Sequence, residues 1–159
     1  MMNPNIRPAT AADVPARFPQ VPARPADSRP DSFRAGARKY TNAEIAALGA
    51  DPEKSFRVWA DIDGPVRGYG LGRRRDEGGP GGPLRARRPL YLDDLGVEAS
   101  ARGRGIGEAL YAALKAEARA RGGVALTLNL WVGNGEAARF YERRGRRPLK
   151  TLREERWDD

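Results

Sequence analysis

A short turn rich in glycine and arginine, residues 102–107, constrains the fold of this chain more than any other stretch. The apolar segment before it, residues 90–97, is typical of a strand. The segment after it carries apolar residues at every fourth position, as one helix face does: Ile106, Leu110, Leu114 and Ala118. A glycine turn between a strand and a helix leaves backbone N–H groups pointing outward at the positive helix end. The pattern therefore predicts an anion-binding turn, and we expect the anion to be a pyrophosphate.

Spacing excludes two other phosphate-binding motifs. A nucleotide P-loop needs a lysine and a hydroxyl residue directly after its last glycine, and neither follows Gly107. A dinucleotide fingerprint needs a third glycine at the position that Glu108 occupies. A turn that only reverses the chain is the structural alternative, but it does not explain why two arginines alternate with the glycines.

Composition limits the chemistry that the chain can perform. The 159 residues include no cysteine and no histidine. Disulfides, thiolate metal sites and a cysteine acyl intermediate are therefore excluded, and we expect no metal site. A general base has to be a carboxylate, a lysine, a tyrosine or a relayed water.

The charge is strongly basic, with a net value of +8. This charge suits a polyanionic ligand, but arginine is spread along the whole chain, so we favour a solvated basic surface over a nucleic-acid footprint. No apolar run approaches the ~20 residues of a membrane span, and residues 1–5 lack a secretory pattern. We expect a cytoplasmic protein without membrane contact.

Periodicity and turn residues predict the remaining elements of a single domain over residues 1–159. Five prolines make residues 15–38 irregular or mobile, and a Gly-Pro-rich run does the same for residues 73–88. Strands are predicted at residues 6–10, 56–62, 66–71 and 125–132, and a terminal strand or pair of strands at residues 147–157. Helices are predicted to begin at residue 10 and to span residues 41–49 and 136–144. This order predicts an α/β (α+β) fold, a mixed sheet flanked by helices.

Two motifs carry a family resemblance. The pattern Arg102-Gly-Arg-Gly-Ile-Gly107 resembles the acetyl-CoA motif of the GNAT superfamily of N-acetyltransferases, Arg/Gln-x-x-Gly-x-Gly/Ala. Residues 134–145 are similar to a second segment of that superfamily, Asn-x-x-Ala-x-x-Phe-Tyr-x-x-x-Gly. The resemblance covers residues 90–149. Residues 90–95, Leu-Tyr-Leu-Asp-Asp-Leu, are similar to the diamine (spermidine/spermine) acetyltransferase branch.

The resemblance implies a mostly antiparallel mixed sheet in which two parallel strands splay apart and hold acetyl-CoA as co-substrate. The backbones of Leu95 and Val97 would pair with the pantetheine as an extra strand does. Asn134, Ala137 and Tyr141 of the second motif would also contact the cofactor. The pyrophosphate would bind to the turn, at Arg102, Gly103, Arg104, Gly105, Ile106 and Gly107. A surface role stays open for both arginines.

The resemblance also implies two catalytic residues. Tyr141 is similar to the family's general acid, which protonates the coenzyme A sulfur. The alternative is a core position on an apolar helix face with Phe140. Asp93 takes the place of a base that is glutamate in the diamine branch, and its shorter side chain favours a bridging water. Because successive strand residues point to opposite faces, at most one of Asp93 and Asp94 is expected to face the cleft; both can instead be structural.

These residues predict an N-acetyltransferase that transfers the acetyl group directly to a primary amine in a ternary complex. The acceptor stays open between a small-molecule amine (aminoglycoside, amino-acid or xenobiotic) and a protein amine, and so does homodimer formation. A catalytically impaired acyl-CoA-binding protein is the first alternative. A basic nucleic-acid-binding module is the second and the less favoured one.

Overall fold

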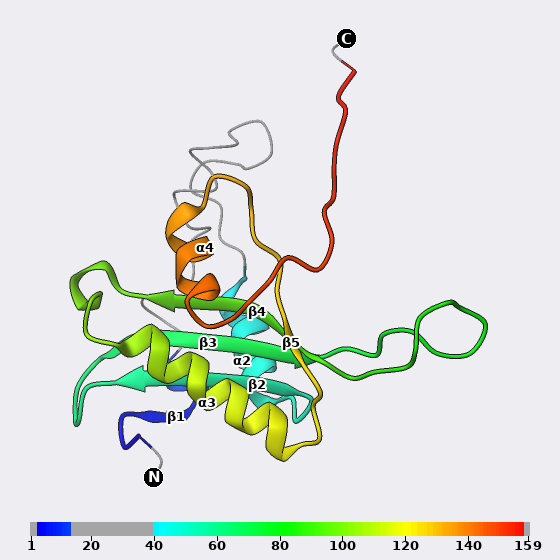
Figure 1. The fold of residues 1–159 in the computed structure, drawn as a ribbon. Coiled ribbons are helices and arrows are strands. Elements are labelled where there is room, and N and C mark those ends of the chain that lie inside the picture. The colour runs from blue at the N-terminus through cyan, green and yellow to red at the C-terminus, as the bar shows by residue number, and fades with distance from the viewer. Residues whose placement is uncertain (1–2, 14–39, 158–159) are drawn as a thin grey trace.

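The computed structural model describes residues 3–13 and 40–157. Its five strands form one mixed sheet in the order β1-β2-β3-β4-β5 (Figure 1). Neighbouring strands are antiparallel except β4 and β5, which are parallel. The strands are β1 (Ile6–Pro8), β2 (Lys54–Ala60), β3 (Val66–Arg74), β4 (Leu90–Val97) and β5 (Leu126–Thr127). The expected mixed, mostly antiparallel sheet is confirmed.

Helices cover both faces of this sheet. Helix α3 (Ile106–Ala120) crosses one face, and α2 (Asn42–Ala50) lies behind the other, while α4 (Gly135–Glu142) stands beside β4 (Figure 1). Short 3-10 helices lie at η1 (Ala11–Asp13) and η2 (Ala99–Ala101). Helix α2 begins in a capping box, in which Thr41 and Glu44 satisfy each other's backbone N–H groups. None of the described helices has the length and apolarity that a bilayer crossing requires.

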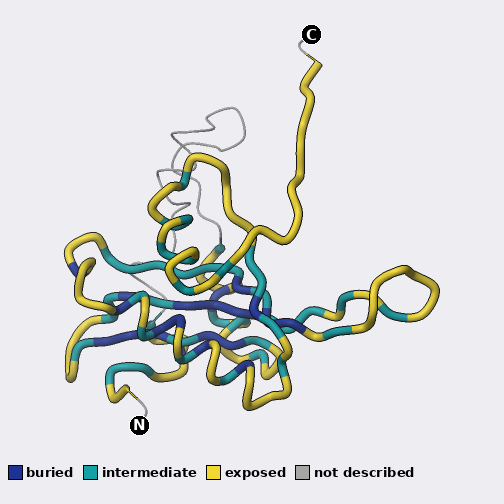
Figure 2. Tube along the Cα trace, viewed as in Figure 1, coloured by how far each residue is buried: buried dark blue, intermediate teal, exposed yellow. Residues whose placement is uncertain are grey.

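The sheet separates two hydrophobic layers, and the central strands are the most deeply buried part of the described chain (Figure 2). On the α2 face, Ile45 packs with a cluster of buried residues from β2 and β3 that includes Val58 and Leu71. On the α3 face, the fully buried Leu110 and Leu114 belong to clusters that contain residues of β2, β4 and β5. Burial of such leucines contributes roughly 1.5–3 kcal/mol each, so both helices are firmly attached to the sheet.

A β-bulge interrupts β4. Leu92 pairs with Gly72 and Asp94 pairs with Leu71, so Asp93 is the extra residue between two consecutive pairs. The bulge shifts the strand's alternation by one residue. Leu90, Leu92, Leu95 and Val97 therefore all belong to, or pack against, the clusters on the α3 face.

The parallel pairing of β4 with β5 is very short. Leu90 pairs with Leu126 and Tyr91 with Thr127, and the ladder then ends. Beyond it, residues 92–97 of β4 have no neighbouring strand on that side among the described residues. The two parallel strands thus diverge, as the resemblance implies.

Several predicted elements differ from the structure. The strand predicted at residues 125–132 stops at Thr127, and the terminal strand predicted at 147–157 is wrong, because that segment extends away from the body (Figure 1). Residues 125–132 do alternate between apolar and other side chains, but Val132 and Leu152 are 85% and 96% exposed, so no apolar layer covers either segment there. The helix predicted from residue 10 is the single 3-10 turn η1 within the described residues, and the segment 15–38, predicted to be irregular or mobile, lies outside them.

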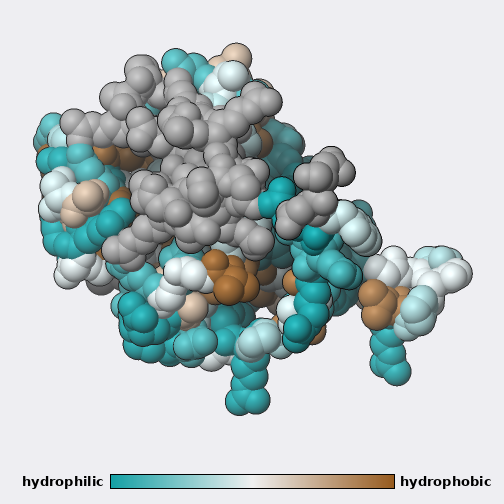
Figure 3. Space-filling model, turned by 90° about the horizontal axis from the view of Figure 1, so that it is seen from above, coloured by the Kyte–Doolittle hydropathy of each residue, from teal (hydrophilic) through white to brown (hydrophobic). Residues whose placement is uncertain are grey.

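Residues 73–88 are more ordered than predicted. Arg73 and Arg74 belong to β3, and an antiparallel bridge joins Glu77 to Arg87. The segment forms an arm that projects from one end of the sheet in both the ribbon and the space-filling views (Figures 1 and 3).

Candidate functional site

The glycine turn at the start of α3 has the backbone that an anion cradle needs. Gly103 and Gly105 have φ angles of +78° and +75°, and Gly105 is the N-cap of the helix. A left-handed residue with a side chain costs roughly 1–2 kcal/mol. A Cβ at either position would meet nothing within 4 Å. Glycine is therefore required for conformation, and the space above the turn is open to a ligand.

The first residues of α3 fix the orientation of the backbone N–H groups that form the anion cradle, residues 102–107. Ile106 is 2% exposed and packs with Trp59 and Leu110, which anchors the first turn of α3 against the sheet. The first backbone N–H groups of a helix have no partner within it, so those at Ile106, Gly107 and Glu108 are available to an anion.

The second motif forms α4 and meets the first one directly. The Oδ1 of Asn134 caps the helix by accepting a hydrogen bond from the Ala137 N–H at 3.3 Å. A Cβ on Gly107 would lie 3.5 Å from Val97 Cγ2 and 3.7 Å from Phe140 Cε2. Three segments far apart in sequence therefore converge at Gly107: the turn, the end of β4 and helix α4.

The open edge of β4 lies between these motifs. The N–H of Glu98 donates to Arg67 O on β3 at 2.8 Å. Because N–H and C=O directions alternate along a strand, the polar groups of Val97 and Leu95 point the other way, toward the unpaired edge. The Val97 carbonyl accepts a weak contact from Arg102 Nε at 3.4 Å. These two residues offer the backbone groups that an added strand-like ligand would use.

The second arginine of the turn has partners within the protein. Arg104 Nη2 lies 3.3 Å from Asp61 Oδ1, and its guanidinium lies 5.2 Å from the centre of the Trp59 ring. Asp61 also binds Arg67 at 2.7 Å, and this hydrogen bond is the main reason that the pKa of Asp61 is lowered. A phosphate would compete with Asp61 for a guanidinium that is half exposed.

Tyr141 lies in an aromatic cluster with α3. Its ring centre is 5.1 Å from that of Phe140 and 6.2 Å from that of Tyr111. Burial raises the pKa of Tyr141 well above the usual range of a phenol, and the charge of Asp94 adds to this increase, as does Tyr111, while Arg144 opposes it. The hydroxyl therefore keeps its proton at neutral pH and can act as a proton donor.

The bulge sends the two neighbouring carboxylates to different partners. Asp93 Oδ2 lies 2.9 Å from Arg73 Nε, and the Asp93 side chain is 12% exposed. Asp94 is the carboxylate whose charge acts on Tyr141, and it also hydrogen-bonds with Tyr69. The family resemblance favoured Asp93 over Asp94 as the base, and no sequence pattern pointed to Tyr69; the break in strand alternation at residues 93–94 was the available signal for the bulge.

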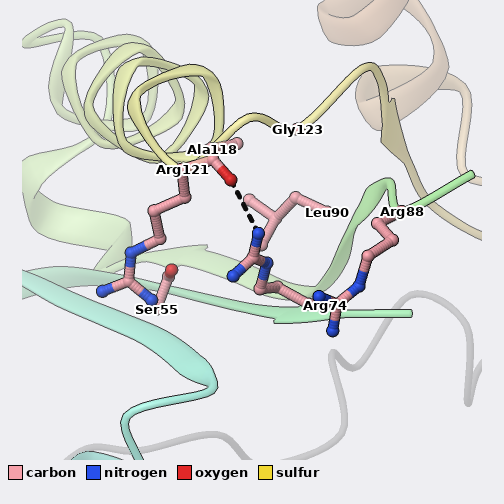
Figure 4. Close-up of a pocket in the computed structure, with 7 residues that line it drawn as sticks. All are labelled: Ser55, Arg74, Arg88, Leu90, Ala118, Arg121 and Gly123. Carbon is pink, nitrogen blue, oxygen red and sulfur yellow. Dashed lines mark hydrogen bonds between the residues drawn. The ribbon is translucent and has the colours of Figure 1, made fainter. Parts of the chain in front are cut away.

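A depression lies near the C-terminal end of α3, the end opposite to the glycine turn, and does not belong to this site (Figure 4). Arg74 Nη2 donates to the carbonyl of Arg121 at 2.6 Å, while Arg88 and Arg121 form ion pairs with Asp76 and Glu117. Its lining residues are Ser55, Arg74, Arg88, Leu90, Ala118, Arg121 and Gly123. Because internal partners already bind these guanidinium groups, the depression is a poor anion site.

Metal-binding side chains do not gather at the site. Residues 3–13 and 40–157 contain no cluster of three or more His, Cys, Asp or Glu side chains that could hold an ion.

Known structures share this architecture. The BH1408 protein from Bacillus halodurans, solved as a tetramutant, is 26% identical with a TM-score of 0.85, over 96% of this chain and 99% of that chain. Glucosamine-6-phosphate N-acetyltransferase from Arabidopsis thaliana is 16% identical (TM-score 0.65), over 96% and 97% of the two chains. An aminoglycoside 6'-N-acetyltransferase from Acinetobacter baumannii is 12% identical (TM-score 0.70), over 98% of each chain. At such identities the last two show the fold alone.

No curated protein matches the chain, and the comparisons do not single out a diamine acetyltransferase. The model of the acetyltransferase (GNAT) family matches residues 23–145, which is most of the sequence and includes both motifs. The glycine turn, the diverging parallel strands and the family match agree: this chain belongs to the GNAT acetyltransferase family.

Proposed function

We propose that the protein transfers an acetyl group from acetyl-CoA to a primary amine by direct attack in a ternary complex. The observation that carries this proposal is the convergence at Gly107, which lies against Val97 of β4 and Phe140 of α4. This convergence connects the anion cradle, the open edge of β4 and Tyr141 along one continuous path. A cofactor with a pyrophosphate at one end and a reactive acyl group at the other fits such a path.

The residues present fit acetyl-CoA, which supplies an activated thioester. The backbone N–H groups of the turn, residues 102–107, would hold the pyrophosphate, because two left-handed glycines leave the approach open. Arg102 and Arg104 would add charge-assisted contacts, with Arg104 exchanging Asp61 for a phosphate oxygen. The backbones of Leu95 and Val97 would pair with the pantetheine.

The chain's own acid-base groups have complementary tasks. Tyr141 Oη holds a proton at neutral pH and would donate it to the leaving sulfur. A carboxylate of the bulge would take the proton that the attacking amine loses, directly or through a water. Asp94 is better placed for this task than Asp93, because Asp93 is held by Arg73.

Charge narrows the class of acceptor. Polyamines and other polycations need several carboxylates around the cleft, but Asp93 and Asp94 are the acidic residues of β4 and the net charge is +8. We therefore favour an amine of low positive charge or one that carries an anionic group. A small molecule and a protein amine both meet this requirement.

Free-thiol release tests the proposal. Acetyl-CoA would be incubated with tyramine, glucosamine 6-phosphate, kanamycin, spermidine and a lysine-containing peptide in turn. We expect turnover above the rate of acetyl-CoA hydrolysis with at least one amine, and Tyr141→Phe as the matched variant should lose most of it. Tight acetyl-CoA binding with no transfer to any amine would instead indicate a catalytically impaired acyl-CoA-binding protein.

A further inference from the structure

We propose that Tyr69 is a positioning residue, whose hydroxyl holds the Asp94 carboxylate in place on the α2 face of β4. The proposal rests on the proposed function, since it gives Asp94 a task in acetyl transfer. It also makes a claim about Asp94 in the free protein, which can be measured without any substrate.

The strand pairing fixes the direction of Tyr69. Its neighbours Gly68 and Gly70 face α3, because a Cβ on them would lie 2.9 Å from Ile106 Cγ2 and 2.7 Å from Leu114 Cδ1 respectively. Tyr69 therefore projects from the opposite face, where it packs against the cluster under α2.

A glycine on β4 makes room for the ring. Tyr69 pairs with Gly96, and a Cβ on Gly96 would lie 2.5 Å from Tyr69 Cε1 and 2.7 Å from its Cζ and Oη. The outer half of the ring, with its hydroxyl, thus lies directly over the backbone of β4. No other residue type would leave this space, so a glycine at position 96 is required for the Tyr69 ring to pack over β4.

The bulge brings Asp94 to the same face. Asp94 pairs with Leu71, whose side chain belongs to the α2 cluster, and cross-strand partners project to the same side. Asp94 is also two residues before Gly96, so its carboxylate lies next to the Tyr69 hydroxyl. If β4 kept Asp93 but had no bulge, regular alternation from Leu92 would direct Asp94 toward α3 and away from Tyr69.

The hydroxyl of Tyr69 acts as a donor in this arrangement. Burial raises the pKa of Tyr69 well above its usual value, with Asp94 adding to this increase through its charge and through their hydrogen bond, and Tyr40 contributing less. A hydroxyl that keeps its proton at neutral pH can donate to the carboxylate, which stabilises the charged form of that carboxylate and fixes its position. The groups around Asp94 are thus Tyr69 on β3, Tyr40 before α2, Tyr141 on α4 and the neighbouring Asp93–Arg73 pair.

The variant Tyr69→Phe removes the hydroxyl and keeps the ring, because phenylalanine fills the same space over Gly96. It therefore tests the role of the hydroxyl alone. Tyr91→Phe is a matched control, because it removes a tyrosine hydroxyl from β4 without removing the ring. The ring of Tyr91 contacts Arg75, whose guanidinium lies 3.4 Å from the ring centre. We expect Tyr69→Phe to lower kcat at neutral pH by about tenfold and to leave acetyl-CoA affinity unchanged. The deficit should shrink at alkaline pH, where the amine is already neutral. Tyr91→Phe should behave as the parent protein.

A double-mutant cycle with Asp94→Asn tests whether Tyr69 acts through Asp94. In that background, Tyr69→Phe should cause no further loss of turnover. The same fold loss in both backgrounds, or a loss that is equal at every pH, would assign Tyr69 a merely structural role and overturn the proposal.

A second readout needs no acetyl transfer at all. In protein labelled with 13Cγ-aspartate, the Asp94 signal is identified by its absence in Asp94→Asn, and its titration is followed by NMR. Tyr69→Phe should move the midpoint of this titration to higher pH, and Tyr91→Phe should not move it. An unchanged midpoint would refute the role of Tyr69, whereas a shifted midpoint in a protein that acetylates no amine would refute only the proposed function.

Discussion

Asp93 and Arg73 form an ion pair across the β3–β4 ladder, with Oδ2 2.9 Å from Nε. This pair gives Asp93 a structural partner at the point where the bulge inserts it into the strand. Its neighbour Asp94 acts on Tyr141 and Tyr69 instead. One extra residue in β4 thus gives two adjacent carboxylates different partners.

The first prediction compares these two carboxylates by isosteric replacement. Asp94→Asn should lower kcat by about a hundredfold, because general base catalysis contributes on this scale. Asp93→Asn should keep turnover within about threefold and lower the free energy of unfolding by roughly 0.5–1 kcal/mol, a small value because Arg73 is 39% exposed. Steady-state kinetics and urea unfolding measure the two effects. A larger loss of kcat in Asp93→Asn than in Asp94→Asn would instead assign the role of general base to Asp93.

The second prediction concerns the proton of Tyr141. Tyr141→Phe should lower kcat by about a hundredfold, with the acetyl-CoA dissociation constant within about twofold of that of the parent protein. Because burial raises the pKa of Tyr141, the phenol stays protonated through neutral and moderately alkaline pH. Activity should therefore show no decline caused by Tyr141 up to about pH 9.5. An alkaline decline near pH 8 that disappears in Tyr141→Phe would contradict this protonation state.

The third prediction uses two glycines at opposite ends of α3. Gly105 and Gly122 both have a φ of +75°, and a Cβ on either would meet nothing within 4 Å. Alanine should therefore destabilise the fold equally at both positions, by roughly 1–2 kcal/mol.

Only Gly105→Ala should weaken acetyl-CoA binding, by about tenfold or more, because only Gly105 lies in the proposed cradle. Calorimetry measures the affinity, and thermal unfolding confirms that the two variants share the same loss of stability. Equal affinities for the two variants would place the pyrophosphate elsewhere.

Much of the fold could be predicted from local patterns. The strand before the glycine turn, the helix after it and the cap at Asn134 each depend on residues close together in sequence, and the structure contains all three. The terminal strand was predicted wrongly, because residues 147–157 lack a regular apolar period and local sequence does not show whether a sheet edge is available. Leu152 is 96% exposed for that reason.

The choice between Asp93 and Asp94 as the proposed base depends on a tertiary feature. Strand alternation predicts that Asp93 and Asp94 face opposite ways, but which one faces Tyr141 is set by the register with β3, where the shift falls between Leu71 and Gly72. Tyr69 could not be singled out, because its relation to Asp94 depends on the pairing with Gly96 across the ladder.

Titration of the purified protein with acetyl-CoA tests the central claim most directly. Isothermal calorimetry should show one site with micromolar affinity, weakened in Gly105→Ala and retained in Gly122→Ala and Tyr141→Phe. Heat changes that do not differ from dilution at millimolar acetyl-CoA would contradict the assignment of the glycine turn and the open edge of β4 as its binding site.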